Sequence, residues 1–282
     1  MKEKVIKMEY QIIALDVDGT LTNSEKKITS RTRRALIEAQ LQGKKVIVAS
    51  GRHQFGLKDI ASELQLDRFG GYVMAFNGGR VIDASTGEVL SAKYFPREYI
   101  KPVCDTVKDA NITVISYEGD TIVMNDKVND YSFIESKILG MDYKQVPDLA
   151  EYITFDVNKL LLAGEPSVLD EYEKILVEKY KGYFDVFKSC PFFLEIMPFG
   201  VNKGACMPAL LEKLGLTREQ LIACGDSYND MTMIGYAGLG VCMENGENDV
   251  KKISNVIADS NDNDGVAKIV EEYMLHRNAQ IA

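Results

Sequence analysis

Two carboxylates, Asp16 and Asp18, follow directly after a short apolar run at residues 12–15. In an extended backbone, residues i and i+2 project to the same side, so both side chains would face one place. Like charges at such short range disfavour each other's ionisation unless a cation lies beside them. The pattern is typical either of a cation-binding site at the end of a strand or of a hairpin turn formed at Asp18-Gly19.

Three later segments place polar side chains at similar positions, namely Ser50 after residues 46–49, Lys203 before an apolar stretch, and Asp226 after residues 221–224. Each alone has an ordinary interpretation as a helix cap, a solvated lysine or a turn. Together they form a set with a chemical purpose. Carboxylates are the hard oxygen ligands that Mg²⁺ prefers, and lysine and serine supply charge and hydrogen bonds for a phosphoryl group. One carboxylate then remains as a nucleophile.

The elements that must position these groups are short buried strands alternating with helices. Apolar runs predict strands at 12–15, 46–49, 72–76, 221–224, 239–243 and 256–258, and helices at 30–41, 55–64, 203–214 and after 264. Such βαβ units predict an α/β fold with a doubly wound, mostly parallel sheet. Ligands bind beyond the carboxyl ends of the strands in these sheets, which is where the polar groups would lie.

The middle third of the chain has a different pattern. It predicts hairpins at 80–94 and 111–125, helices at 96–110, 128–139 and 166–180, strands at 158–163, 183–188 and 192–197, and a linker at 140–157. This mixture is typical of an inserted α+β domain. We therefore expect a catalytic core formed by residues 1–83 and 196–282, and an inserted domain at 84–195.

The motifs at residues 16–20, 50–52, 202–204 and 225–230 resemble, in order, those of haloacid dehalogenase superfamily phosphatases of the Cof-type subgroup. The segments 77–79 and 263–267 are similar to further segments of that subgroup. The resemblance implies a Rossmann-like core with a type IIB cap, and hydrolysis of phosphorylated metabolites such as sugar phosphates. No motif covers the insert; Tyr117, Glu118, Lys159 and Phe193 are candidate specificity residues there.

The resemblance also implies roles for individual residues. Asp16 would attack the phosphorus and form an aspartyl-phosphate, and Asp18 would serve as general acid and then general base. Mg²⁺ would be held by Asp16, the Asp18 carbonyl and Asp226, with Ser227 nearby. The phosphate would be bound by Ser50, Lys203, Asn229 and the amides of Val17 and Gly51, with Asp230, Asn77 and Arg52 in support. Many relatives have threonine at the position of Ser50, so the hydroxyl is retained.

Two other functions fit parts of this pattern. A phosphomutase would move phosphate within a sugar and would release none. A non-catalytic phospho-aspartate receiver also clusters Asp and Lys on a doubly wound sheet, yet it needs neither the acid Asp18 nor an inserted domain. Both features disfavour the receiver, and net phosphate release from a hexose phosphate would separate a phosphatase from a phosphomutase.

The bulk composition limits the partners. The formal charge of −9 disfavours nucleic acid and anionic membranes as partners, and no apolar run approaches the length of a membrane-spanning helix. The first residues carry no apolar signal segment, and the five cysteines are scattered, so we expect a cytoplasmic protein. The expected partner is a small phosphorylated substrate; the sequence predicts no oligomeric state.

One further segment resembles a metal-binding motif of another kind. Residues 260–271 nearly match a calcium-binding loop, with Asp262, Asp264, Gly265 and Glu271 at matching places. The first place is Ser260 and the preceding element is a strand, so we interpret Asp264 as a helix N-cap.

Overall fold

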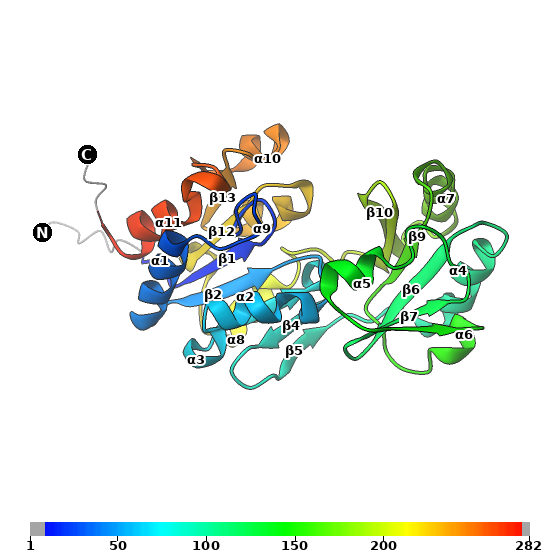
Figure 1. The fold of residues 1–282 in the computed structure, drawn as a ribbon. Helices are drawn as coiled ribbons and strands as arrows, with labels where there is room; N and C mark the ends of the chain where they lie inside the picture. Colours follow the sequence, from blue (N-terminus) through cyan, green and yellow to red (C-terminus); the bar gives the residue numbers. More distant parts are fainter. Residues whose placement is uncertain (1–8, 278–282) are drawn as a thin grey trace, which may run out of the picture. The chain divides into compact units, whose positions relative to one another are not determined.

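Figure 1 shows the computed structural model, which describes residues 9–277. The chain divides into two units, Met1–Ser91 with Asn202–Ala282, and Ala92–Val201. The expected insert at 84–195 begins and ends earlier than the second unit, because residues 84–91 belong to a hairpin of the first sheet. The function of the second unit as a cap stays a prediction.

Within residues 9–277, the first unit is built on an eight-stranded sheet in the order β14-β13-β12-β1-β2-β3-β4-β5. Its strands are β1 Ile12–Asp16, β2 Lys45–Ala49, β3 Tyr72–Ala75, β4 Arg80–Asp83, β5 Val89–Ala92, β12 Leu221–Gly225, β13 Leu239–Met243 and β14 Val256–Ala258. The strands from β14 to β3 are parallel, and β4 returns antiparallel to β3. The expected α/β fold with a mostly parallel sheet is therefore confirmed.

Helices cover this sheet and explain why its central strand β1 is apolar from Ile12 to Leu15, up to the terminal Asp16. They are α1 Ser30–Leu41, α2 Lys58–Glu63, α3 Leu66–Phe69, α8 Met207–Lys213, α9 Met231–Tyr236, α10 Asn248–Ile253 and α11 Gly265–Ile269. Ile12 and Ala14 of β1 share a core with Met207 of α8 and Met233 of α9. On strand β1 every residue is buried, as expected where helices cover both faces of a parallel sheet.

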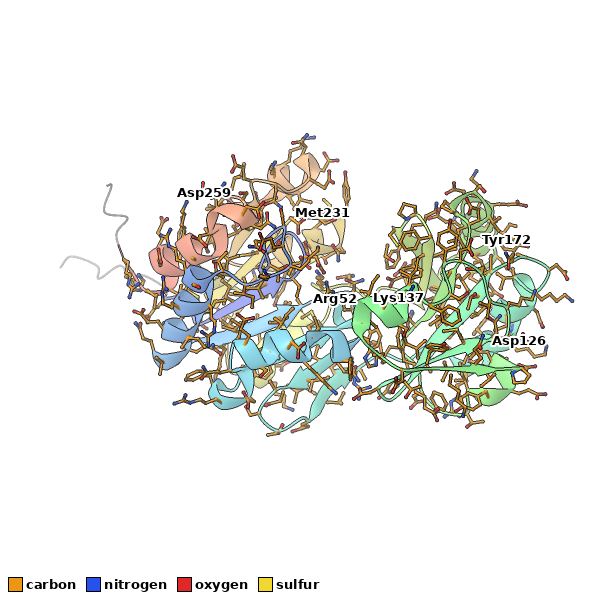
Figure 2. All side chains as sticks on the ribbon, viewed as in Figure 1. Arg52, Asp126, Lys137, Tyr172, Met231 and Asp259 are labelled. Atoms are coloured by element: carbon orange, nitrogen blue, oxygen red, sulfur yellow. The ribbon has the colours of Figure 1, made fainter. Side chains whose placement is uncertain are left out.

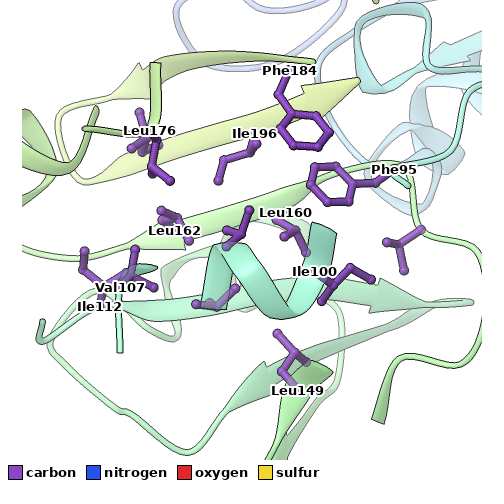
Figure 3. Close-up of a cluster of buried hydrophobic side chains, with 14 of the residues drawn as sticks. Phe95, Ile100, Val107, Ile112, Leu149, Leu160, Leu162, Leu176, Phe184 and Ile196 are labelled. Atoms are coloured by element: carbon purple, nitrogen blue, oxygen red, sulfur yellow. The ribbon is translucent and has the colours of Figure 1, made fainter. Parts of the chain in front are cut away.

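The second unit contains, among the described residues, a six-stranded sheet in the order β10-β11-β9-β6-β7-β8. Its elements are β6 Thr113–Glu118, β7 Thr121–Asn125, β8 Tyr143–Val146, β9 Leu160–Ala163, β10 Phe184–Cys190, β11 Phe193–Pro198, α4 Ile100–Thr106, α5 Ile134–Leu139, α6 Leu149–Tyr152 and α7 Pro166–Lys179. All pairings except β7 with β8 are antiparallel. Figure 3 shows its apolar core, in which Phe95 stacks on Phe184.

The structure differs from the expected elements mainly in this second unit. The expected linker at 140–157 contains β8 and α6. The expected helix at 128–139 begins only at Ile134. Side chains before it bond the backbone instead, since Ser132 Oγ accepts from the Asn129 amide and Asn129 Oδ1 accepts from the Tyr131 amide. Such local bonds compete with helix formation.

No helix among residues 9–277 combines the length and apolarity that crossing a membrane requires. The thiols of Cys104, Cys190, Cys206, Cys224 and Cys242 are all free.

Candidate active site

A buried lysine lies at the centre of the site. Asp16 is the last residue of β1, and its Oδ1 is 2.5 Å from Lys203 Nζ. The same Nζ lies 2.6 Å from Asp230 Oδ1. The side chains of Lys203 and Asp230 are 0% exposed. One ammonium therefore joins the carboxylates of two chain segments in a place with little solvent.

The backbone around Lys203 approaches another helix closely. A Cβ on Gly204 would lie 2.5 Å from the Thr232 carbonyl oxygen, so only glycine fits there. The Gly204 amide also donates to Thr232 Oγ1 at 3.1 Å. We expected Lys203 to begin a helix; this expectation was wrong, because it lies in a turn and α8 begins at Met207.

Asp230 is fully committed to holding its neighbours. Its Oδ1 accepts from Lys203, and its Oδ2 accepts from the amides of Asp226 and Ser227, both at 3.0 Å. A Cβ on Gly225 would lie 2.4 Å from Asp230 Cβ, which explains the glycine before Asp226. These bonds suit Asp230 to orienting Lys203 and the turn after β12.

Among the described residues, Asp16, Asp226 and Asp230 offer carboxylate oxygens that lie within 4.8 Å of one another. Thr20 Oγ1 donates to Asp226 Oδ1 at 3.0 Å and fixes its orientation. Gly19 has φ +83°, and a Cβ there would lie 2.5 Å from Asp226 Oδ2. Convergent oxygens with glycine opposite are the donor set that a hard divalent cation takes, so the residues fit a metal ion.

The pKa shifts also indicate that the negative charge of the clustered carboxylates exceeds the positive charge of Lys203. Burial, followed by the neighbouring Asp230 and Asp226, raises the pKa of Asp16 to about 8, although Lys203 opposes this. Burial and Asp230 raise the pKa of Asp226 to about 6. Burial alone would lower the pKa of Lys203, yet Asp16 and Asp230 outweigh it and raise that pKa. A bound divalent cation would favour ionisation of both carboxyls.

Asp18 lies beside this buried cluster and is more exposed, with 38% of its side chain accessible. Its Oδ1 accepts from Arg52 Nη2 at 2.7 Å and from Lys26 Nζ at 2.9 Å. Arg52 follows the end of β2, where Figure 2 labels it. Two cations from different loops thus hold one oxygen of the carboxylate.

Of the predicted phosphate-binding residues, Ser50 and Gly51 follow β2 and Asn229 follows β12, while the supporting residue Asn77 follows β3. Ser50 is buried, and its Oγ accepts from the Arg52 amide at 3.2 Å. The Asn77 amide donates to the Ser50 carbonyl, and Asn77 Oδ1 accepts from Asn229 Nδ2 at 3.1 Å. Gly51 would place a Cβ 3.1 Å from Asn77 Nδ2. A chain of contacts therefore links the second and last motifs through Asn77, while Val17 lies buried beside Asp16.

Two residues of this site received no role from the sequence. Thr20, inside the first motif, turns out to orient Asp226. Lys26 contacts Asp18, and nothing in the sequence distinguished it from other surface lysines. A hydroxyl two residues after the acid is a signal that could have found Thr20; Lys26 offered none.

Residues 13–270 match the sequence model of a family described as haloacid dehalogenase-like hydrolase. A Streptococcus pyogenes protein named as a candidate phosphatase is 32% identical over 276 residues, which cover 95% of this chain and 100% of that protein. A Bacillus subtilis protein named 5-amino-6-(5-phospho-D-ribitylamino)uracil phosphatase is 29% identical, with coverage of 95% and 97%.

Solved structures show the same fold. A haloacid dehalogenase-like hydrolase from Bacteroides thetaiotaomicron has a TM-score of 0.89 and 38% identity, covering 94% of this chain and 99% of that one. A subclass IIB sugar phosphatase has a TM-score of 0.79 at 23% identity, with coverage of 93% and 98%, and shows likeness of fold alone.

Proposed function

The chain belongs to the haloacid dehalogenase-like hydrolase family and is a phosphatase, and we propose that it hydrolyses small phosphorylated metabolites, sugar phosphates in particular, through an aspartyl-phosphate on Asp16 with Mg²⁺ as cofactor. One observation carries this proposal. Lys203 Nζ contacts both Asp16 and Asp230 at zero exposure, and the carboxylate of Asp226 lies within the same cluster. A nucleophile, a cation for the phosphate and a metal ligand thereby meet in one place.

In the first step, an Asp16 oxygen forms a bond to phosphorus while the bond from phosphorus to the leaving oxygen breaks. Asp18 gives its proton to that leaving oxygen, which departs as an alcohol. Lys203 holds both the nucleophile and the transferring oxygens, and the Ser50 hydroxyl and nearby amides bind the remaining oxygens. Asp230 keeps Lys203 in position through its short ion pair.

In the second step, water attacks the phosphorus and the bond to Asp16 breaks. Asp18, now a carboxylate, accepts the proton of that water. Inorganic phosphate leaves, and both carboxyls return to their starting states. When bound by Asp16, Asp226 and the Asp18 carbonyl, with Ser227 nearby, Mg²⁺ would neutralise the charge that otherwise separates an anionic nucleophile from an anionic phosphate.

The substrate class is proposed from two kinds of support. The Bacillus subtilis relative is named for a phosphorylated ribityl compound, and one structural neighbour is titled a sugar phosphatase. The second unit, which we propose as the specificity cap, also carries buried polar groups suited to hydroxyls. Lys159 pairs with Glu195 at 3.1 Å, and Tyr117 donates to Glu135 at 2.6 Å.

The other two candidate specificity residues have different surroundings. Glu118 is exposed and accepts from the hydroxyl of Tyr152, while Phe193 is buried against Phe192. Within the second unit, Lys159 and Tyr117 are therefore the better-supported candidates. We also propose a cytoplasmic location, in keeping with the free thiols.

The test is phosphate release from a panel of phosphorylated metabolites with Mg²⁺, measured for wild type, Asp16→Asn and Asp18→Asn. We expect release from at least one sugar phosphate, near-total loss in Asp16→Asn, and a slowed or trapped aspartyl-phosphate in Asp18→Asn. A hexose phosphate that is isomerised without release would instead favour a phosphomutase. Undiminished turnover by Asp16→Asn would exclude the covalent step.

A further inference from the structure

The segment that resembles a calcium loop serves another purpose in the structure. Its acidic side chains have protein partners, because Asp264 Oδ1 accepts from Thr29 Oγ1 at 2.5 Å and Glu271 pairs with Arg31 through two hydrogen bonds. Asp264 is the N-cap residue of α11, as expected, although its φ is +59° and its side chain does not bond the helix backbone. The segment instead lies against the loop that follows β1.

Three side chains brace that loop. Asp262 accepts from both the amide and the hydroxyl of Ser24, at 2.8 and 2.7 Å. Asn261 Nδ2 donates to the Thr22 carbonyl at 2.9 Å, and Asn245 Nδ2 donates to the Gly19 carbonyl at 2.8 Å. The two Ser24 bonds lower the pKa of Asp262, which keeps it ionised and able to accept both.

The loop itself forms a tight turn that presents Lys26. Asn23 Oδ1 accepts from the amides of Glu25 and Lys27, and the Lys26 amide donates to the Asn23 carbonyl. Lys26 has φ +61°, a left-handed conformation that is costly for a residue with a side chain. In that conformation Nζ reaches Asp18 Oδ1 at 2.9 Å.

Both cations at Asp18 contact the same oxygen. Lys26 and Arg52 reach Oδ1, and among residues 9–277 no hydrogen bond to Oδ2 is formed. With Oδ1 fixed at two points, the carboxyl group has little freedom to rotate. Oδ2 is left as the oxygen that can face a leaving group and later a water molecule.

We propose that Asp262 is a positioning residue for catalysis, which holds the loop at residues 22–27 so that Lys26 fixes Asp18 with Oδ2 directed at the leaving oxygen. The inference rests on the proposed role of Asp18 as general acid. Asp262 touches no reacting atom and acts only through Ser24 and Lys26.

A pair of substrates separates positioning of the acid from general damage. The p-nitrophenolate group leaves well without a proton, whereas an alkoxide such as that of glycerol phosphate needs one. A misplaced acid therefore lowers kcat/KM for the alkyl phosphate much more than for the aryl phosphate. Turnover of both substrates by the wild type, and its loss in Asp16→Asn, tests the phosphatase itself. The ratio of the two kcat/KM values in the variants tests the inference.

We expect Asp262→Ala and Lys26→Met each to lower the ratio of the alkyl to the aryl kcat/KM by about tenfold. A positioned general acid accelerates a reaction by about 10²- to 10⁴-fold in total, so this loss is a part of its contribution. Asp18→Asn sets the full scale of the loss. In the Lys26→Met background, Asp262→Ala should change the ratio no further, because both act along one path. Should Asp262→Ala fail to fold, Lys26→Met still tests the path, since its side chain is 66% exposed.

The matched control is Asp249→Ala, which removes an exposed carboxylate paired with Lys252 on α10. Its alkyl-to-aryl ratio should equal that of the wild type. The inference is overturned if either Lys26→Met or Asp262→Ala reduces both substrates equally, or if the double variant shows the product of the two single losses. Equal losses would mean that the segment only stabilises the fold.

Discussion

Replacing Lys203 with methionine should destabilise the protein strongly, because two buried carboxylates depend on its charge. Removing one partner of a buried ion pair costs about 3–5 kcal/mol. Here the side chains of Lys203 and Asp230 are both fully buried, so little solvent can compensate. At about 2–4 °C per kcal/mol for a unit of this size, the melting temperature should fall by roughly 6–20 °C.

The loss should also grow with pH. The pKa of Asp16 is raised to about 8, against about 3.9 in an unfolded chain. Between these values the native state binds a proton that the unfolded state has released, so the stability contributed by this group falls as the pH rises. Without Lys203 the pKa rises further, and the variant should lose more stability at pH 8 than at pH 5.

Thermal unfolding of the metal-free protein in EDTA, followed by far-UV circular dichroism, measures this effect; the chain has no tryptophan to report by fluorescence. The matched control is Lys213→Met, which removes a 53% exposed lysine that lies 3.5 Å from Glu88. Its free energy of unfolding should change by less than about 0.5 kcal/mol. A loss in Lys203→Met no larger than this at pH 8, or one that shrinks from pH 5 to pH 8, would refute the reasoning.

Three further outcomes are expected. Mg²⁺ should raise the melting temperature more at pH 8 than at pH 5.5, because protons compete with the metal ion for carboxyl groups whose pKa is raised, such as that of Asp16. In a thermal-shift assay, Asp16→Asn should lose most of this increase in melting temperature. Gly19→Ala should abolish Mg²⁺ binding in calorimetry, since its Cβ would lie 2.5 Å from Asp226 Oδ2. The control Gly43→Ala has a similar φ and no atom within 4 Å of the new Cβ, so it should lose stability through backbone strain only and leave Mg²⁺ binding unchanged. Lys159→Met, which breaks a buried ion pair, should speed amide hydrogen exchange across the second unit, and unchanged protection there would contradict a stabilising role.

The location of the site could be predicted because strand ends in a parallel sheet meet at one edge. Asp16, Ser50 and Asp226 each follow a short apolar run, and β2, β1 and β12 are neighbours in the sheet. Pairing of these strands in register therefore brings distant segments together. Lys203 joins them from a turn, and its ion pairs to Asp16 and Asp230 show why a lysine at this place is buried.

Other structural features could not be predicted from local sequence patterns. Strand β8, Tyr143–Val146, is exposed at three of its four positions, so it lacks the apolar alternation that marks a strand. The contact between Ser24 and Asp262 joins residues 238 positions apart and depends on hydrogen bonds to the Asp262 side chain. The left-handed conformation of Lys26 likewise follows from the closed turn around Asn23, because the residue type itself disfavours it.

The position of β1 in the sheet has a consequence for how the protein is made. Strand β1 is synthesised first, and it pairs on one side with β2 but on the other with β12, which begins at Leu221. On the ribosome, one edge of this fully buried strand, apolar up to Asp16, must therefore stay unpaired while the intervening two hundred or so residues emerge. A nascent chain truncated before Leu221 would expose that edge, and its need for a chaperone should end once β12 has docked.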